Sequence, residues 1–294
     1  MHELAQTATE AFRHPWAAGI IFIATFILIS FRRLSLLPIG RPSAALTGAV
    51  LMVAFGVVHP EEAYQLVNWD TICLLLGMMI IAEHLRAAGL FERFSRLAEK
   101  ISSPFGLLVI VGFSAAIASA ILVNDPVCVV MTPLVLEICR RKRLKPFPYL
   151  MILATSSNIG STLTLTGNPQ NMIIGSLSKL GFLRFMGLMA APFLVSMLIN
   201  LVLAWFYYRH ELVEDPASGP SDSEILPRES LPEKIQKTRR LRIGLIGLGL
   251  ACAGFVAGFS MAFSALAGAV IVITFPRKDP SELLEKMEWS LLMF

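Results

Sequence analysis

A run of polar residues lies inside a long uncharged stretch of this 294-residue chain. Residues 155–171 include three Asn, two Gly, one Pro and several hydroxyl side chains, and the surrounding stretch Phe147–Ser178 contains no charged residue. Backbone that leaves the helix at membrane depth is tolerated only where it is buried in protein or lines a wet cavity. Secondary transporters build their substrate and ion sites from such interrupted helices. The run therefore predicts a broken helix over 147–179 that holds a transport site.

Charged residues are scarce in this chain and are kept apart from its apolar segments. They make up 16% of the residues, whereas soluble domains carry about 25%. A helix that spans a bilayer needs about 17–25 apolar residues. The uncharged blocks that suit such helices are Trp16–Phe31, Ser43–Val58, Phe105–Asn124, Phe147–Ser178, Phe185–Tyr208 and Ile243–Pro276. We therefore expect an all-α, multi-pass integral protein of the cell membrane, with the lipid bilayer as its surroundings.

The residue patterns that other functions need are missing from the sequence. Basic residues lie in short loops, where they set membrane orientation rather than bind nucleic acid. The four Cys show no metal-ligand spacing. A His-Glu-x-x-His motif and a second carboxylate deep in an apolar stretch are both absent, which argues against an intramembrane hydrolase. We expect neither an enzyme nor a cofactor, apart from Na⁺ or H⁺ as a coupling ion.

The distribution of Lys and Arg predicts the topology. Basic residues gather in 32–41, 86–100 and 140–145, and the positive-inside rule places these segments in the cytoplasm. The N-terminus is then outside. Because the chain leaves the cytoplasm and returns to it within 104–139, this segment is predicted to be a re-entrant hairpin. Its middle is the turn sequence Asn124-Asp125-Pro126, since Pro cannot continue a helical hydrogen-bond ladder.

An internal repeat divides the chain into a long first part and a short second part. Residues 45–74 align with 265–294 without a gap and with nine identities. The sequence therefore predicts a first transmembrane repeat over 1–208, a cytoplasmic linker over 209–242 that is polar and of mixed charge, and the start of a second repeat over 243–294. The linker makes the second repeat start from the opposite side of the membrane, which predicts an inverted repeat. The second repeat is expected to be incomplete, because its last element stops after about one turn.

Two motifs resemble a known superfamily. Val123–Leu134 reads Val-Asn-Asp-Pro-x₅-Thr-Pro-Leu, and Ser157–Asn171 reads Ser-Asn-Ile-Gly-Ser-x₄-Thr-Gly-Asn-Pro-Gln-Asn. They resemble the superfamily of arsenite permeases, sodium–proton antiporters and divalent-anion (citrate, dicarboxylate) symporters, and most of all its arsenite-permease-like branch. The resemblance implies two inverted repeats, each with a re-entrant hairpin and a broken helix. It also implies coupling to a Na⁺ or H⁺ gradient and, in many members, a homodimer.

Oxygen-bearing residues at the hairpin tip and the helix break are candidates to bind the coupling ion. Asp125 is the only carboxylate deep in an apolar stretch, and intramembrane acids are usually functional. Carbonyl and amide oxygens suit a hard cation. The coupling-ion candidates are Asn124, Asp125, Asn158, Gly160 and Ser161, of which Asn124, Asp125 and Asn158 are the candidates for Na⁺.

Backbone amides, hydroxyls and Asn side chains around the break are candidates to bind the substrate, because exposed N–H groups at a new helix start attract anions. The substrate candidates are Ser157, Thr162, Thr166, Gly167, Asn168 and Asn171. Helix capping and small-residue packing remain alternative roles for these residues. Asn200 stands alone in an apolar helix and is expected to make an interhelical hydrogen bond instead.

These features favour a secondary active transporter that moves a small anion, such as arsenite, citrate or a dicarboxylate, coupled to a Na⁺ or H⁺ gradient. A sodium/proton antiporter that carries no anion stays open, because the sequence holds one deep acid and few intramembrane cations. A fragment that transports nothing and only docks against another membrane protein is a third hypothesis.

Overall fold

The computed structural model describes residues 15–30, 40–91, 93, 98, 100–178, 180–212, 231–275, 285, 287 and 289. The described residues form helices joined by turns, and none of them lies in a β-strand. Two of their helices, Pro104–Ile121 and Phe182–Tyr208, are long and apolar enough to cross a membrane. The all-α class and the membrane character predicted from the sequence are thus confirmed for the described part of the chain.

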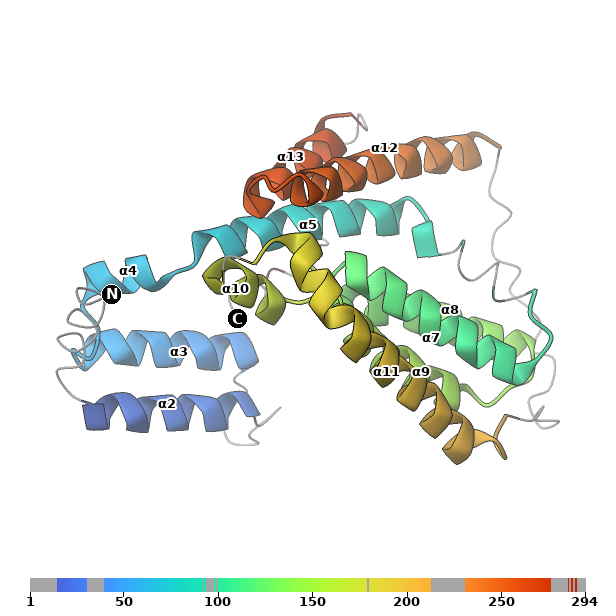
Figure 1. Ribbon diagram of the computed structural model, residues 1–294, viewed down its shortest axis with the longest axis horizontal. Helices are drawn as coiled ribbons and strands as arrows, with labels where there is room; N and C mark the ends of the chain where they lie inside the picture. Colours follow the sequence, from blue (N-terminus) through green and yellow to red (C-terminus); the bar gives the residue numbers. More distant parts are fainter. Residues whose placement is uncertain are drawn as a thin grey trace. The chain divides into compact units, whose positions relative to one another are not determined.

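The chain divides into two units by its internal contacts. The first unit comprises residues 1–69 and 288–294, and the second comprises 70–287. The helices of the first unit are α2 (Pro15–Ser30), α3 (Arg41–Ala54) and α4 (Pro60–Leu66). α2 and α3 lie side by side (Figure 1). A Cβ placed on Gly48 would lie 2.3 Å from the hydroxyl of Thr25, so only glycine permits this close approach.

The second unit carries the polar run. Its helices are α5 (Trp69–Ala87), α7 (Pro104–Ile121), α8 (Asn124–Arg141), α9 (Pro146–Ser161), α10 (Pro169–Ser178), α11 (Phe182–Tyr208), α12 (Leu231–Val256) and α13 (Met261–Thr274). α9 contacts α7, α8 and α11. Ala116, Phe193 and Met197 form a buried cluster between α7 and α11 and pack against Ile159 of α9. Proline occupies the first position of α7, α9 and α10, where its missing N–H costs nothing.

Small residues bring α5, α12 and α13 close together (Figure 1). A Cβ on Gly77 would lie 2.7 Å from the backbone of Ala265, and one on Gly268 would lie 2.5 Å from the carbonyl oxygen of Gly247. Close backbone approach through small residues is typical of helices packed in membranes. Polar contacts add to it, since Nε2 of His84 lies 3.0 Å from the carbonyl oxygen of Arg240.

The helix after the predicted linker begins earlier than we expected from the sequence. The sequence assigned residues 209–242 to a linker, whereas α12 begins at Leu231. Residues 231–242 are rich in Glu, Lys, Gln and Arg, which are good helix formers, so the apolar helix extends backward into the charged segment. Residues 213–230 of the predicted linker lie outside the described residues, as do 1–14 and most of 276–294.

The helix bounds agree with the internal repeat. α3 and α13 each have 14 residues, and the 220-residue offset of the repeat relates both their first and their last residues. Gly48 and Gly268 are equivalent under the same offset, and each lies at the tight crossing of its own helix pair. α3 and α13 therefore share a packing feature as well as sequence.

Candidate functional site

The tip of the α7–α8 pair presents Asn124 and Asp125. α7 ends at Ile121 and α8 begins at Asn124, so only two extended residues join the helices. The first turn of a helix leaves backbone N–H groups without intrahelical partners. Asn124 and Asp125 therefore lie at the positive end of the helix dipole, among amides that have no partner within the helix.

The predicted interruption of the following helix coincides with residues 162–168. α9 ends at Ser161 and α10 begins at Pro169. The hydroxyl of Ser161 donates to the carbonyl of Asn158 over 2.8 Å, and that of Thr162 donates to the carbonyl of Ile159 over 2.7 Å. Hydroxyls thus satisfy carbonyls of the last turn of α9, as side chains do where a helix ends.

Three hydrogen bonds bring the tip and the interruption together. The backbone N–H of Asn124 donates to the carbonyl of Gly167 over 3.2 Å, and the hydroxyl of Ser157 donates to the carbonyl of Asn124 over 3.1 Å. The hydroxyl of Thr164 donates to the carbonyl of Ala120, in the last turn of α7. The C-terminal ends of α7 and α9 and the N-terminal ends of α8 and α10 consequently meet in one region, which offers both carbonyl and amide groups.

Asn124, Asp125 and Asn158 keep accessible side chains in this region. Asn158 and Asp125 are exposed and Asn124 is partly exposed. The side-chain amide of Asn124 donates to the side-chain oxygen of Asn158 over 2.9 Å. Among the described residues, the carboxylate of Asp125 makes no side-chain hydrogen bond or ion pair and lies beside this pair in sequence. The three Na⁺ candidates are thus exposed or partly exposed polar groups in this region.

Several other candidates are buried by packing. Ser157 is fully buried and its hydroxyl lies 3.0 Å from that of Ser119. A Cβ placed on Gly160 would lie 2.2 Å from the carbonyl oxygen of Ala116. The close packing of α7 against α9, which the sequence left open as an alternative, is therefore what the structure shows at Gly160. Thr166 is also buried, within 3.3 Å of the hydroxyl of Thr164.

Asn168 and Asn171 hold the ends of α9 and α10 together. The side-chain oxygen of Asn168 accepts a 2.8 Å hydrogen bond from the backbone N–H of Asn171 and so caps α10. The side-chain amide of Asn171 lies within hydrogen-bonding distance of three carbonyl oxygens. They belong to Ser161 at the end of α9 (3.1 Å) and to Thr162 and Thr164 in the interruption (3.4 and 2.9 Å). Gly167 is confined as well, since a Cβ there would lie 2.2 Å from the carbonyl oxygen of Ser161.

Two further polar residues support the site and were missed from the sequence. Ser119 of α7 contacts Ser157, and Ser156 of α9 accepts a hydrogen bond from the side chain of Asn200 at 3.0 Å. The interhelical hydrogen bond predicted for Asn200 is therefore confirmed. A lone Ser in an apolar helix is a weak signal, because its hydroxyl often bonds to its own backbone.

The chemistry of the site is that of oxygen and amide groups. The residues that the structure describes contain no cluster of three His, Cys, Asp or Glu side chains able to hold a metal ion. Amide, carboxylate and carbonyl oxygens are hard ligands suited to cations such as Na⁺, and helix N-terminal amides suit anions. The arrangement offers groups of the kinds that bind dissolved cations and anions.

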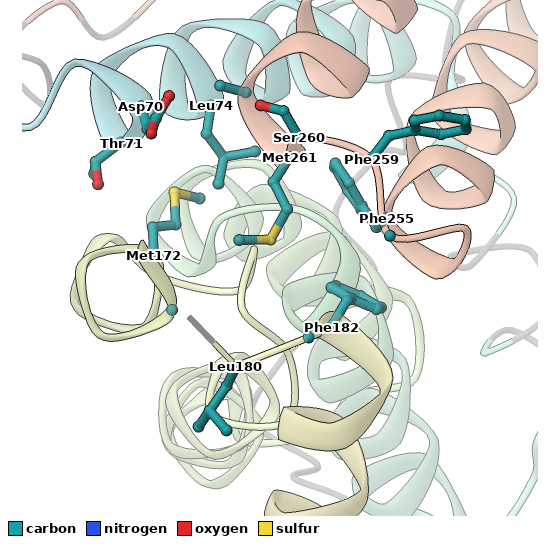
Figure 2. Close-up of a pocket in the computed structure, with 14 residues that line it drawn as sticks. Asp70, Thr71, Leu74, Met172, Leu180, Phe182, Phe255, Phe259, Ser260 and Met261 are labelled. Carbon is teal, nitrogen blue, oxygen red and sulfur yellow. The ribbon is translucent and has the colours of Figure 1, made fainter. Parts of the chain in front are cut away.

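A cavity of about 330 Å³ borders the other side of α10. Figure 2 shows its lining from α5 (Asp70), α10 (Met172), the start of α11 (Phe182) and the α12–α13 turn (Phe259, Met261). None of the eleven predicted site residues is among the described residues that line this cavity. Asp70 is the one charged side chain among those lining residues. The region around Asn124 and Asn158, where the predicted residues gather, therefore remains the candidate site.

Comparison with known proteins identifies the family of this chain. A model of the citrate transporter family matches residues 20–294. A transporter of Dictyostelium discoideum named arsB is 37% identical over 202 residues, which cover 67% of this chain and 36% of the relative. The silicon efflux transporter LSI3 of Oryza sativa subsp. japonica is 29% identical over 328 residues, covering 94% of this chain and 67% of the relative.

An uncharacterized transporter of Mycobacterium tuberculosis is 30% identical over 285 residues, which cover 93% of this chain and 64% of the relative. The chain spans about one third of the length of the Dictyostelium relative and about two thirds of the other two. All three relatives are transporters by name.

Proposed function

Since this chain belongs to the citrate transporter family, we propose that it acts in secondary active transport of a small anion across the cell membrane, driven by a Na⁺ or H⁺ gradient. The family and the relatives are transporters and not enzymes. Arsenite, citrate, a dicarboxylate and, from the name of the rice relative, silicate are the substrates to test.

The observation that carries this proposal is the meeting of four helix ends beside the Asn124–Asn158 pair. Carbonyl oxygens at the ends of α7 and α9 and amides at the starts of α8 and α10 face one region. Each helix end carries about half an elementary charge, negative at the C-terminus and positive at the N-terminus. A cation and an anion can therefore be held close together, as a coupled transporter requires.

We assign the coupling ion to the accessible end of this region. Asn124, Asp125 and Asn158 would supply side-chain oxygens. Gly160 and Ser161 are buried in the last turn of α9 and would contribute backbone carbonyls once Asn168 and Asn171 release the carbonyl of Ser161. Na⁺ would bind to these oxygens, whereas H⁺ coupling would use the carboxylate of Asp125 alone. No covalent bond is made or broken in either case.

We assign the substrate to the interruption between α9 and α10. Thr162 and Asn168 are partly exposed and would meet an anion first. The other substrate candidates, Ser157, Thr166, Gly167 and Asn171, are buried, and their polar groups would hold the backbone amides in position. Partial opening of the Asn168–Asn171 cap would then accompany substrate binding.

The wider architecture is also a proposal. Two inverted repeats would enclose the site, with a re-entrant hairpin over 104–139, the N-terminus outside and the linker 209–242 in the cytoplasm. The shared helix bounds of α3 and α13 support the repeat. We expect a homodimer in the membrane and no nucleic-acid partner.

Two alternatives make different predictions. A sodium/proton antiporter would use Asp125 without carrying an anion, and the solitary carboxylate at the tip favours it. A chain that transports nothing and docks against another membrane protein is the second alternative.

Transport by the full chain in proteoliposomes tests the proposal. Vesicles receive an inward Na⁺ gradient or an inward H⁺ gradient, and uptake of radiolabelled citrate, arsenite and silicate is measured against protein-free vesicles. Gradient-dependent uptake of one anion is the expected result. A Na⁺-driven pH change without anion uptake would establish the antiporter, and the absence of any flux would support the docking hypothesis.

A further inference from the structure

A second cavity lies at the opposite end of the α7–α8 pair from Asn124. It has a volume of about 420 Å³, and its polar lining comes from the start of α7 and the residues that follow α8. The residues that line it are Ile101, Ser102, Ser103, Pro104, Arg141, Lys142, Arg143 and Leu144. None of these residues belongs to the proposed transport site.

The cavity lies where the end of α8 comes back beside the start of α7. α7 begins at Pro104 after the N-cap residue Ser103, whose hydroxyl accepts a 3.3 Å hydrogen bond from the backbone N–H of Gly106. α8 ends at Arg141, and the ammonium group of Lys142 donates to the carbonyl of Ile101 over 2.8 Å. This bond joins the two segments and places basic side chains beside the hydroxyls.

Three basic side chains line the cavity: Arg141, Lys142 and Arg143. Glu137 forms an ion pair with Arg141 at 2.7 Å. No acidic residue is among the described residues that line the cavity. The hydroxyls of Ser102 and Ser103 add donors for an oxyanion.

Aromatic side chains mark this end of the bundle as a membrane interface. Phe105 and Phe147, each just after the first residue of its helix, are 41% and 56% exposed. The ring of Phe147 packs edge-on against Tyr208 at 5.9 Å, and Tyr207 beside it is 72% exposed. Aromatic belts form at the level of lipid headgroups.

The mouth of the cavity lies at this end of the bundle, near the exposed aromatic side chains. The hydroxyl of Tyr149 in α9 donates to the carbonyl of Pro104 over 3.1 Å, which ties the start of α9 to the cavity wall. A phosphate bound among the basic side chains would therefore have exposed aromatic surface close by, where acyl chains can pack.

We infer that this basic cavity binds the phosphodiester of an anionic phospholipid headgroup. Arg and Lys pair with phosphate oxygens, and basic pockets between transmembrane helices bind such headgroups. Inorganic phosphate is also an anion, but it has no acyl chains to pack against the exposed Phe105 and Phe147. The lipid is therefore favoured over a soluble phosphate.

Native mass spectrometry of the full chain with added phosphatidylglycerol or phosphatidylcholine tests the inference. The test variant is Arg143→Asn, which removes one charge at a left-handed residue (φ 53°) that Asn tolerates well. The matched control is Arg184→Gln, another exposed arginine, in the first turn of α11. Thermal unfolding confirms that both variants fold.

We expect phosphatidylglycerol to bind in preference to phosphatidylcholine. Arg143→Asn weakens that binding about fivefold, and the pair Arg141→Gln with Arg143→Asn weakens it about 25-fold, since each basic side chain near a membrane contributes a similar increment. Arg184→Gln leaves it unchanged. Equal binding of the two lipids, or equal losses in test and control variants, would overturn the inference. Displacement of the lipid by millimolar inorganic phosphate would overturn it as well and would identify a soluble-phosphate site.

Discussion

The side-chain amide of Asn124 donates a 2.9 Å hydrogen bond to the side-chain oxygen of Asn158, although 34 residues separate them in the sequence. Asn124 opens α8, and Asn158 lies in the last turn of α9. One contact therefore couples the tip of the α7–α8 pair to the interruption between α9 and α10. A movement of either element changes the oxygens that the other presents.

Breaking this pair tests the coupling directly. Asn124→Ala and Asn158→Ala each remove one partner, and we expect the two single losses of stability to add up to more than the loss in the double variant. The excess should be about 0.5–1.5 kcal/mol, the net contribution of an intramolecular hydrogen bond. Thermal unfolding in detergent supplies the four values. Strict additivity would mean that the bond contributes nothing.

Asp125→Asn should abolish gradient-driven uptake. The substitution removes the one carboxylate at the tip and keeps its size, so a bound cation loses its only full negative charge. Uptake is measured in proteoliposomes with equal amounts of inserted protein. Glu61→Gln is the matched control, since Glu61 is an exposed acid in the first turn of α4. Unchanged uptake by Asp125→Asn would remove this residue from the coupling-ion site.

Gly160→Ala should destabilise the bundle by about 1–3 kcal/mol through overpacking. The added methyl group would meet the backbone of Ala116, which cannot move aside as a side chain can. Gly187→Ala is the control, because nothing lies within 4 Å of a Cβ at that position of α11. Alanine there should gain up to about 1 kcal/mol of helix propensity. Unfolding temperatures that shift equally in the two variants would contradict the tight α7–α9 contact.

Asn171→Asp should cost about 3 kcal/mol or more. The change replaces an amide donor, which lies near three carbonyl oxygens, with a buried carboxylate that faces them and cannot donate when ionised. Gln170→Glu makes the same chemical change at an exposed neighbour and should have little effect. Thermal unfolding at neutral pH compares the two. A small effect at Asn171 would show that the link between α9 and α10 does not depend on this amide.

The sequence predicted where helices lie better than it predicted where they begin and end. Uncharged blocks predicted the membrane helices, and the polar run at 155–171 predicted that a helix is interrupted, because both signals are local. The start of α12 at Leu231 was missed, since the charged residues of 231–242 fit a polar linker and a helix equally well. Only the continuity with the apolar half of α12 decides between the two.

The candidate site was predicted as a set of residues, and the structure separates their environments. Asn124, Asp125 and Asn158 remain accessible, whereas Ser157 and Asn171 are buried in internal hydrogen bonds. Asn is equally able to cap a helix or bind an ion, and its residue type does not say which. The partners that decide it come from other helices or from across the interruption.

By itself, the sequence determined that the chain is helical, belongs in a bilayer and contains an interrupted polar segment, because these properties follow from composition, hydrophobic length and turn-forming residues. The tertiary structure decided which polar groups are buried and which stay exposed, since Gly160 packs on Ala116 and Asn158 meets Asn124 only after α7, α8 and α9 assemble. Long-range packing selects among the hydrogen bonds that each polar residue can make, and no local pattern encodes that choice.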